Sequence, residues 1–132
     1  MQQGGGEAGR FWGLSQGVIA ACIQVHRALG PGLLESAYEQ CLAHELQLRS
    51  IEFQRQVPLP VEYKGITLDY GYRIDFVVEQ VLVLEVKAVE RLAPIHEAQL
   101  LTYLRLGRYQ TGLLINFHAE TLKRGLRRLT LK

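Results

Sequence analysis

Two stretches decide the fold of this chain: Tyr72-Arg73-Ile74-Asp75-Phe76-Val77-Val78 and Val81-Leu82-Val83-Leu84-Glu85-Val86-Lys87. Both are typical of buried strands, yet each carries charge near one end, where burial of a charge is costly. Because successive strand residues point to opposite faces, Glu85 and Lys87 share a face. With Asp75 they provide two carboxylates and one ammonium, a set suited to a divalent metal and phosphate chemistry. The alternative is a surface hairpin with solvated charges, which this pattern alone does not exclude.

The two strands are expected to form an antiparallel hairpin whose register is selected by burial. A two-residue turn at Glu79-Gln80 would place Glu85 on the apolar face of the first strand. A shift by one residue pairs Val78 with Leu82, gathers the apolar side chains on one face and sets Asp75 opposite Glu85. Because a one-residue slip inverts every side chain of a strand, we expect the second register, with a connection over residues 79–81.

A helix is expected beyond these strands, over residues 94–106. His96, Gln99 and Tyr103 have helical spacing and form one polar stripe on it. Beside the stripe lies an apolar face of leucines, namely Leu100, Leu101 and Leu104. The stripe suits hydrogen bonding to a sheet, and that role is compatible with support of a site.

In this combination the chain resembles the PD-(D/E)xK nuclease superfamily. Within it, the chain closely resembles a small family named for a GxxExxY motif, which is met here at Gly32, Glu35 and Tyr38. The resemblance runs from about Val25 to Leu131 and rests on blocks that occur in order: VHRALGPGLLESAYE, RIDF, LEVKA, HEAQLLTYL and GLLINF. Ordered blocks of this kind are specific, whereas each block alone is not.

The resemblance implies roles for the charged residues. Asp75 and Glu85 would be metal-binding carboxylates and Lys87 the catalytic lysine, with the carbonyl of Val86 as a further metal ligand. Glu35 matches a helical acid that many superfamily members add to the site, directly or through water. Without the resemblance, Glu35 would be read as an N-terminal acid favoured by the helix dipole.

The resemblance also implies a role for the polar helix stripe, and the sequence departs from the family pattern at two positions. Gln99 and Tyr103 match a QxxxY helix that supports the active centre in several branches. Ile74 stands where the superfamily label has Pro, a common change. Arg49-Ser50 stands where family members often have Gly after the second helix, so a turn that differs from the family's is expected here.

The implied function is metal-dependent hydrolysis of nucleic-acid phosphodiesters, with DNA as the expected substrate and one or two Mg²⁺ or Mn²⁺ ions as cofactor. Arg73 and His96 would bind substrate, and a homodimer would allow both strands of a duplex to be reached. The rival is a catalytically silent nuclease-fold module that binds nucleic acid or a protein partner. The presence of both acids and the Lys favours the enzyme, because inactive members usually lose one of them.

Composition adds a second candidate contact with phosphate. The chain has 132 residues, a formal net charge of +2 and 48% hydrophobic residues, as expected for one domain over residues 11–132. Acids stop at Glu120, and basic residues follow it without compensation: Lys123, Arg124, Arg127, Arg128 and Lys132. Arg124, Arg127 and Arg128 are candidate substrate contacts, and a solvated terminal face is the equal alternative.

Cys22 and Cys41 lie among apolar neighbours at helical positions, where buried free thiols are expected rather than a disulfide. The sequence contains no apolar stretch long enough for a membrane span, so a soluble, cytoplasmic protein is expected. Residues 1–10, with Gly4-Gly5-Gly6, are expected to be a disordered leader.

The full pattern predicts an α/β or α+β sandwich, a restriction-endonuclease-like core in which helices flank a mixed sheet. Helices are expected over residues 14–29 and 33–48, separated by Gly30-Pro31-Gly32. Strands are expected over 56–63, 66–78, 81–87, 111–117 and 128–131, with a short helix or turn near Glu120. Pro58 and Pro60 remove ladder donors, so the first strand should be an edge or bulged strand. Gly107 is expected to cap the third helix.

Overall fold

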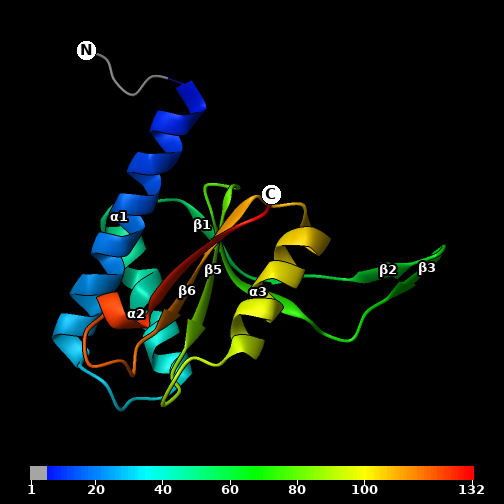
Figure 1. Ribbon diagram of the computed structural model, residues 1–132. Helices are drawn as coiled ribbons and strands as arrows, with labels where there is room; N and C mark the ends of the chain where they lie inside the picture. The colour runs from blue at the N-terminus through cyan, green and yellow to red at the C-terminus, as the bar shows by residue number, and fades with distance from the viewer. Residues whose placement is uncertain (1–5) are drawn as a thin grey trace.

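The computed structural model describes residues 6–132 as a five-stranded sheet with helices on both faces (Figure 1). Helices α1 (Gly6–Leu29) and α2 (Glu35–Leu48) lie on one face, and α3 (Pro94–Gly107) lies on the other. The sheet has the order β1-β4-β5-β6-β7. Its strands are β1 (Phe53–Pro58), β4 (Arg73–Val78), β5 (Leu82–Lys87), β6 (Thr111–Asn116) and β7 (Leu126–Thr130), with the short 3₁₀ helix η1 (Lys123–Gly125) before β7.

The sheet is mixed, as expected. β5 and β6 are parallel, whereas β1–β4, β4–β5 and β6–β7 are antiparallel. A parallel neighbour needs a crossover, and α3 supplies it between β5 and β6. Because helices cover both faces, the central strands are apolar on both sides: all six residues of β6 are buried. The predicted α+β sandwich with a mixed sheet is confirmed.

Two cores pack against the two faces of the sheet. Tyr38 of α2 and Phe76 of β4 are both fully buried in the core beneath α1 and α2. On the other face, Leu100 and Leu104 of α3 pack over Val83 of β5. These leucines belong to the apolar helix face expected from the sequence.

The β4–β5 register is the one that burial predicted. Val78 pairs with Leu82 and Phe76 pairs with Leu84, and residues 79–81 form the connection. Glu79 and Gln80 both have positive φ values, 51° and 66°, so the turn bends with the twist of the strands. The same register sets Asp75 opposite Glu85.

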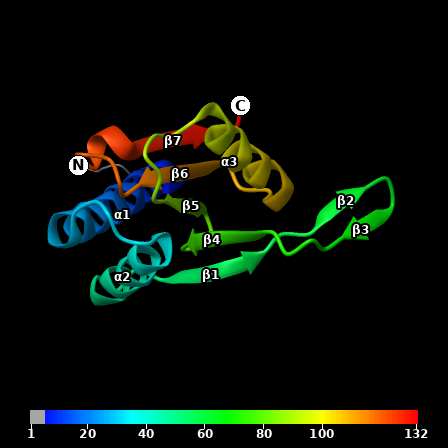
Figure 2. The same ribbon diagram turned by 90° about the horizontal axis from the view of Figure 1, so that it is seen from below.

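Two of the expected strands are each interrupted. β2 (Val61–Tyr63) and β3 (Ile66–Leu68) form a separate hairpin, which extends away from the body of the protein (Figure 2). Residues 59–60 join β1 to β2, and the longer segment 69–72, with Gly71 at a φ of 79°, joins β3 to β4. Because the two connections differ in length, the pairing of β1 with β4 does not continue into the β2–β3 hairpin. β1 is an edge strand, as its prolines predicted.

Other boundaries differ by a few residues. α1 begins at Gly6, inside the segment expected to be a leader, whose residues 1–5 lie outside the described part of the chain. The prediction that Gly107 caps α3 is wrong: Gly107 is the last helical residue, and Arg108 adopts the left-handed conformation with a φ of 64°. A Cβ at residue 107 would lie 2.8 Å from the ring of Tyr109, which explains the glycine.

Both cysteines are free thiols, as expected. Cys22 is buried, and burial raises the pKa of its thiol to about 12, whereas Cys41 is exposed rather than buried. Among residues 6–132 no helix is both long enough and apolar enough to cross a membrane.

Candidate functional site

The β4–β5 ladder ends where the two predicted carboxylates face each other. Ladder pairing covers Phe76–Val78, although β4 continues back to Arg73 and β5 continues on to Lys87. Beyond Phe76, carboxylates replace backbone carbonyls as acceptors: the Asp75 amide donates to Glu85 Oε2 at 2.9 Å, and the Val86 amide donates to Asp75 Oδ2 at 2.8 Å. Each strand therefore satisfies the backbone of the other through a side chain.

The same geometry fixes the direction of the Val86 carbonyl. In a β-strand the N–H and C=O of one residue point toward the same neighbouring strand. The Val86 N–H points toward Asp75 on β4, so its carbonyl oxygen also faces β4. On the next residue, the Lys87 carbonyl accepts from the Phe117 amide on the β6 side, as alternation requires. The Val86 carbonyl thus faces the gap that the two carboxylates occupy.

Burial makes this carboxylate pair electrostatically unfavourable without a cation. Glu85 is buried, and its burial together with the nearby charge of Asp75 raises the pKa of Glu85 to about 8. Burial also raises the pKa of Asp75 to about 6, with the charges of Glu39 and Glu35 adding to the shift. The Lys87 ammonium opposes both shifts without cancelling them. Among the described residues, Asp75 and Glu85 are the carboxylic acids whose pKa is raised, and a nearby cation would stabilise their charged forms.

The donor set fits a hard divalent cation. Two carboxylates and one backbone carbonyl are all oxygen donors, and Mg²⁺ usually takes one or two carboxylates and keeps several waters. Across residues 6–132, no three His, Cys, Asp or Glu side chains come together as a metal-binding group. Glu35, exposed in the first turn of α2, therefore does not complete a three-carboxylate cluster, although its charge reaches both acids.

Lys87 is held by the polar stripe of α3. Its Nζ donates to Gln99 Oε1 at 3.3 Å, and Gln99 Nε2 donates to the Tyr103 hydroxyl at 3.2 Å. Burial raises the pKa of Tyr103, with the charge of Glu85 as the next cause. Gln99 therefore links Lys87 to α3, and Tyr103 holds Gln99 in turn.

The GxxExxY segment forms the turn between α1 and α2, and Glu35 is the first residue of α2. Gly32 has a φ of 111°, a conformation that favours glycine. The Tyr38 hydroxyl donates to the Gly30 carbonyl at 2.5 Å and accepts from the Leu33 amide at 3.0 Å, while its ring stacks on Phe117. The glycine and the tyrosine thus have structural roles that place α2 with its first acid toward Asp75.

Three further residues belong to the site and were not assigned from the sequence. Glu39 is buried one turn beyond Glu35, and its Oε2 accepts from Arg55 Nη2 at 2.9 Å. Gln56 Nε2 donates to the Glu39 carboxylate and lies 3.4 Å from Asp75 Oδ1. The helical pattern placed Glu39 beside Glu35, but nothing in the pattern linked it to β1. Asn116 also supports the site, because it bonds both backbone groups of Val89 after β5.

The two predicted substrate contacts Arg73 and His96 have different surroundings. Arg73 is exposed at the start of β4, two residues from Asp75, and its Nη1 donates to the Tyr72 carbonyl at 3.1 Å. His96 Nδ1 accepts from the Ala93 amide at 2.9 Å and so caps the first turn of α3. His26 and His118 instead bond the carbonyls of Ala119 and Leu33.

The structure separates the three C-terminal arginines. Arg128 bonds Ser15 and lies over the ring of Trp12, both on α1, at 5.2 Å from the ring centroid. Arg127 points toward α3, with its Nε 3.8 Å from a carboxylate oxygen of Glu97. Arg124 is exposed on η1, 3.9 Å from Glu120. The three arginines lie on η1 and β7, beyond β6 from the carboxylates, and their side chains point to different neighbours.

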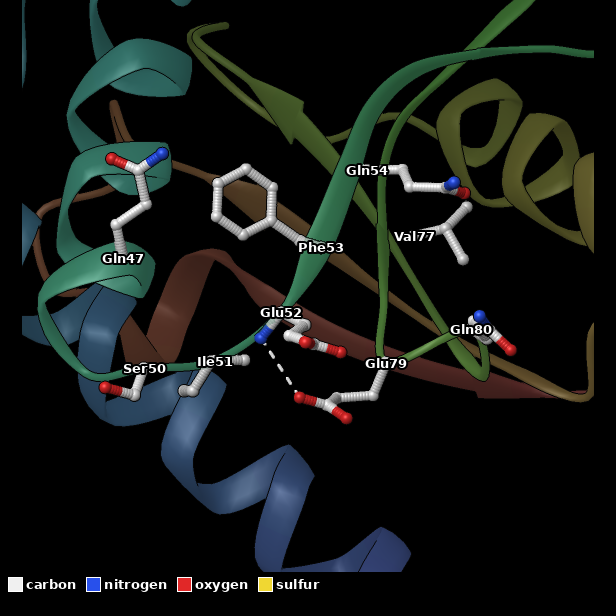
Figure 3. A pocket seen from close by; sticks show the side chains of 9 residues that line it. All are labelled: Gln47, Ser50, Ile51, Glu52, Phe53, Gln54, Val77, Glu79 and Gln80. Atoms are coloured by element: carbon white, nitrogen blue, oxygen red, sulfur yellow. Dashed lines mark hydrogen bonds between the residues drawn. The ribbon is translucent and has the colours of Figure 1, made fainter.

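A pocket of about 670 Å³ lies at the other end of β4, beside the start of β1 (Figure 3). Its lining includes Glu52 and Glu79, and the Glu79 carboxylate accepts from the Glu52 amide at 3.0 Å. None of its lining side chains is basic. This pocket offers no positive charge to a phosphate, and neither Asp75 nor Glu85 lines it.

Comparison with known proteins agrees with this geometry. The model of the PD-(D/E)XK nuclease superfamily matches residues 13–129, nearly the whole chain. Searches of curated proteins and of solved structures gave no match. The matched span includes the carboxylate pair, the lysine and both helices that approach them. The chain therefore belongs to the PD-(D/E)XK nuclease superfamily.

Proposed function

We propose that this protein is a nuclease that hydrolyses phosphodiester bonds of nucleic acid, with DNA as the substrate and Mg²⁺ or Mn²⁺ as the cofactor. The observation that carries the proposal is the parting of β4 and β5 at Asp75 and Glu85, with the Val86 carbonyl beside them. Two buried carboxylates without a cation are unfavourable, so a structural role alone does not account for them.

Asp75, Glu85 and the Val86 carbonyl would hold the ion, and waters would complete its coordination, with Glu35 contacting such a water. A bound divalent ion lowers the pKa of an attacking water and stabilises charge on phosphate oxygens. Asp75 and Glu85 are already fixed by their bonds to the opposite backbone, so they need little rearrangement to bind.

Lys87 would place its ammonium beside the scissile phosphate and offset the charge that develops there. Gln99 keeps that ammonium at the site, since its amide oxygen accepts from Nζ and its amide nitrogen is held by Tyr103. Arg73, exposed and two residues from Asp75, would bind an adjacent phosphate.

The test is cleavage of labelled single-stranded DNA, duplex DNA, plasmid and RNA with Mg²⁺, Mn²⁺ or EDTA. We expect metal-dependent cleavage of DNA that Asp75→Asn abolishes. A folded wild-type protein that cleaves none of these substrates with either metal would overturn the proposal and leave a silent nucleic-acid-binding or protein-binding module. Cleavage of RNA alone would change the substrate assignment only.

A further inference from the structure

The Gln56 side chain bridges two acids at the edge of the candidate metal centre. Its Nε2 lies 3.1 Å and 2.9 Å from Oε1 and Oε2 of Glu39, and 3.4 Å from Oδ1 of Asp75. A carboxamide nitrogen has two hydrogens. One is directed to each acid, so the amide supplies positive charge density between them.

The backbone of β1 departs from strand geometry at this residue. Gln56 has a φ of 52°, in the left-handed region that is unfavourable for a residue with a side chain. Its neighbours Arg55 and Val57 pair with Phe76 and Ile74, which sets Gln56 opposite Asp75. The unfavourable conformation therefore falls at the position where it aims the amide at both acids.

The Glu39 carboxylate is already engaged by two side chains of β1. Its carboxylate accepts from Arg55 Nε at 3.2 Å and Nη2 at 2.9 Å, in addition to the two contacts with Gln56. Three of these contacts fall on Oε2 and one on Oε1, and the Arg55 guanidinium supplies the counter-charge to this carboxylate. Glu39 is also buried, and Arg55 covers the Phe76 ring at 5.8 Å from its centroid.

These contacts leave oxygens for one ion and not for two. Asp75 uses Oδ2 for the Val86 amide, and Glu85 uses Oε2 for the Asp75 amide. Glu85 Oε1, the Val86 carbonyl and the remaining lone pairs of the Asp75 oxygens are left for a cation. A second ion bridged by Asp75 would need an acid on the β1 side, where the Gln56 amide and the neutralised Glu39 already lie.

We propose that the centre binds a single divalent ion, and that the Gln56 amide, backed by Glu39 and Arg55, occupies the place beside Asp75 that a second ion would need. The inference rests on the proposed metal centre but not on cleavage. Gln56 is accordingly a positioning residue for Asp75, and Glu39 is an anchor for Gln56 rather than a metal ligand.

The first measurement is the number of Mn²⁺ ions bound per chain, from calorimetry and from electron paramagnetic resonance of the unbound ion. One ion per chain is the expected result. Two ions would overturn the inference while leaving a nuclease intact, and no ion would overturn both the centre and the inference. One ion without cleavage of any substrate would support the inference and remove the proposed function.

Two variants of Gln56 test its position. Gln56→Glu puts a carboxylate between Glu39 and Asp75, so we expect a second, weaker Mn²⁺ site and dipolar coupling between the ions. Gln24→Glu, the same change on an exposed residue of α1, is the matched control and should still bind one ion. If Gln56→Glu binds one ion with the affinity of the wild type, the amide does not occupy a second-ion position.

Gln56→Gly separates the side chain from the backbone. Glycine accepts the positive φ, so this variant keeps the β1 path and loses only the amide bridge. We expect Mn²⁺ affinity to fall about 10-fold, as for other residues that orient a metal ligand, with an unchanged or higher melting temperature in the metal-free protein. Affinity equal to that of the wild type would show that Gln56 does not position Asp75.

Discussion

The two ends of the β4–β5 pair use the same strands for opposite purposes. From Phe76 to Val78, β4 forms a regular ladder with β5, and Leu82, Val83 and Leu84 are fully buried. One residue further, Asp75 and Glu85 take over the hydrogen bonds that a ladder would provide. The difference shows what ends the regular ladder: side-chain acceptors replace backbone carbonyls, and the Val86 carbonyl is left facing the two carboxylates.

The charged end should be dispensable for folding and essential for chemistry. Lys87→Ala removes the ammonium that Gln99 holds, and we expect cleavage to fall by about 10²–10³-fold. Asp75→Ala should abolish both cleavage and Mn²⁺ binding. Cleavage is measured on labelled DNA, and Mn²⁺ affinity by calorimetry.

The matched control for this change is Lys64→Ala, on the β2–β3 turn away from the carboxylates. It should cleave at the wild-type rate. Equal loss of cleavage and of Mn²⁺ affinity in Lys87→Ala would indicate that Lys87 supports the centre rather than the reaction.

The apolar end should show the reverse behaviour. Leu84 is fully buried in the core beneath α1 and α2, so Leu84→Ala should lower the free energy of unfolding by about 2–5 kcal/mol. The folded fraction should still bind Mn²⁺ with the affinity of the wild type, because Leu84 supplies no ligand to the proposed centre. Val81→Ala, at the exposed turn, should change stability by less than about 0.5 kcal/mol. Urea unfolding and Mn²⁺ titration separate the two properties.

The comparison also predicts a dependence of stability on pH. The pKa of Asp75 rises to about 6 and that of Glu85 to about 8 in the folded protein, so folded chains hold these protons more tightly than unfolded chains. Their contribution to stability is complete below about pH 4 and is lost as pH rises through about 8. We expect the metal-free protein to lose several kcal/mol of unfolding free energy across this window from these two groups, since one pKa unit corresponds to about 1.4 kcal/mol.

Thermal melts at pH 5 and pH 8.5 measure this effect. Glu85→Gln should flatten the dependence, because a neutral amide has no proton to lose, and Mg²⁺ should reduce the loss at high pH. A metal-free protein whose stability is the same at both pH values in wild type and Glu85→Gln would contradict the burial of the pair.

The sequence was sufficient for the β4–β5 register because only one register sets the charged residues Asp75 and Glu85 opposite each other and keeps Glu85 away from Phe76 and Val78. It was insufficient for the Gln56 bridge, since no residue pattern indicates that a glutamine within a strand adopts a left-handed conformation. Glu39 was equally hidden, because its partners on β1 are sixteen and seventeen residues away and have no periodic relation to α2. The last strand was placed from residue 128 rather than Leu126, so Arg127 and Arg128 were not recognised as lying on opposite faces.

The smallest expected effects concern those arginines, and they separate phosphate contact from packing. Arg128 is held by Ser15 and Trp12, so Arg128→Ala should lower stability by about 1 kcal/mol and leave the salt dependence of DNA binding unchanged. Arg124 is exposed on η1, so Arg124→Ala should leave stability unchanged. If Arg124 contacts phosphate, the slope of log affinity against log salt should flatten by about 0.7–0.9. The slope should also be measured in the triple alanine variant of Arg124, Arg127 and Arg128. An unchanged slope in both variants would show that the β7 edge of the sheet does not contact DNA phosphates. Binding would then depend on the parted end of β4 and β5, where Arg73 lies.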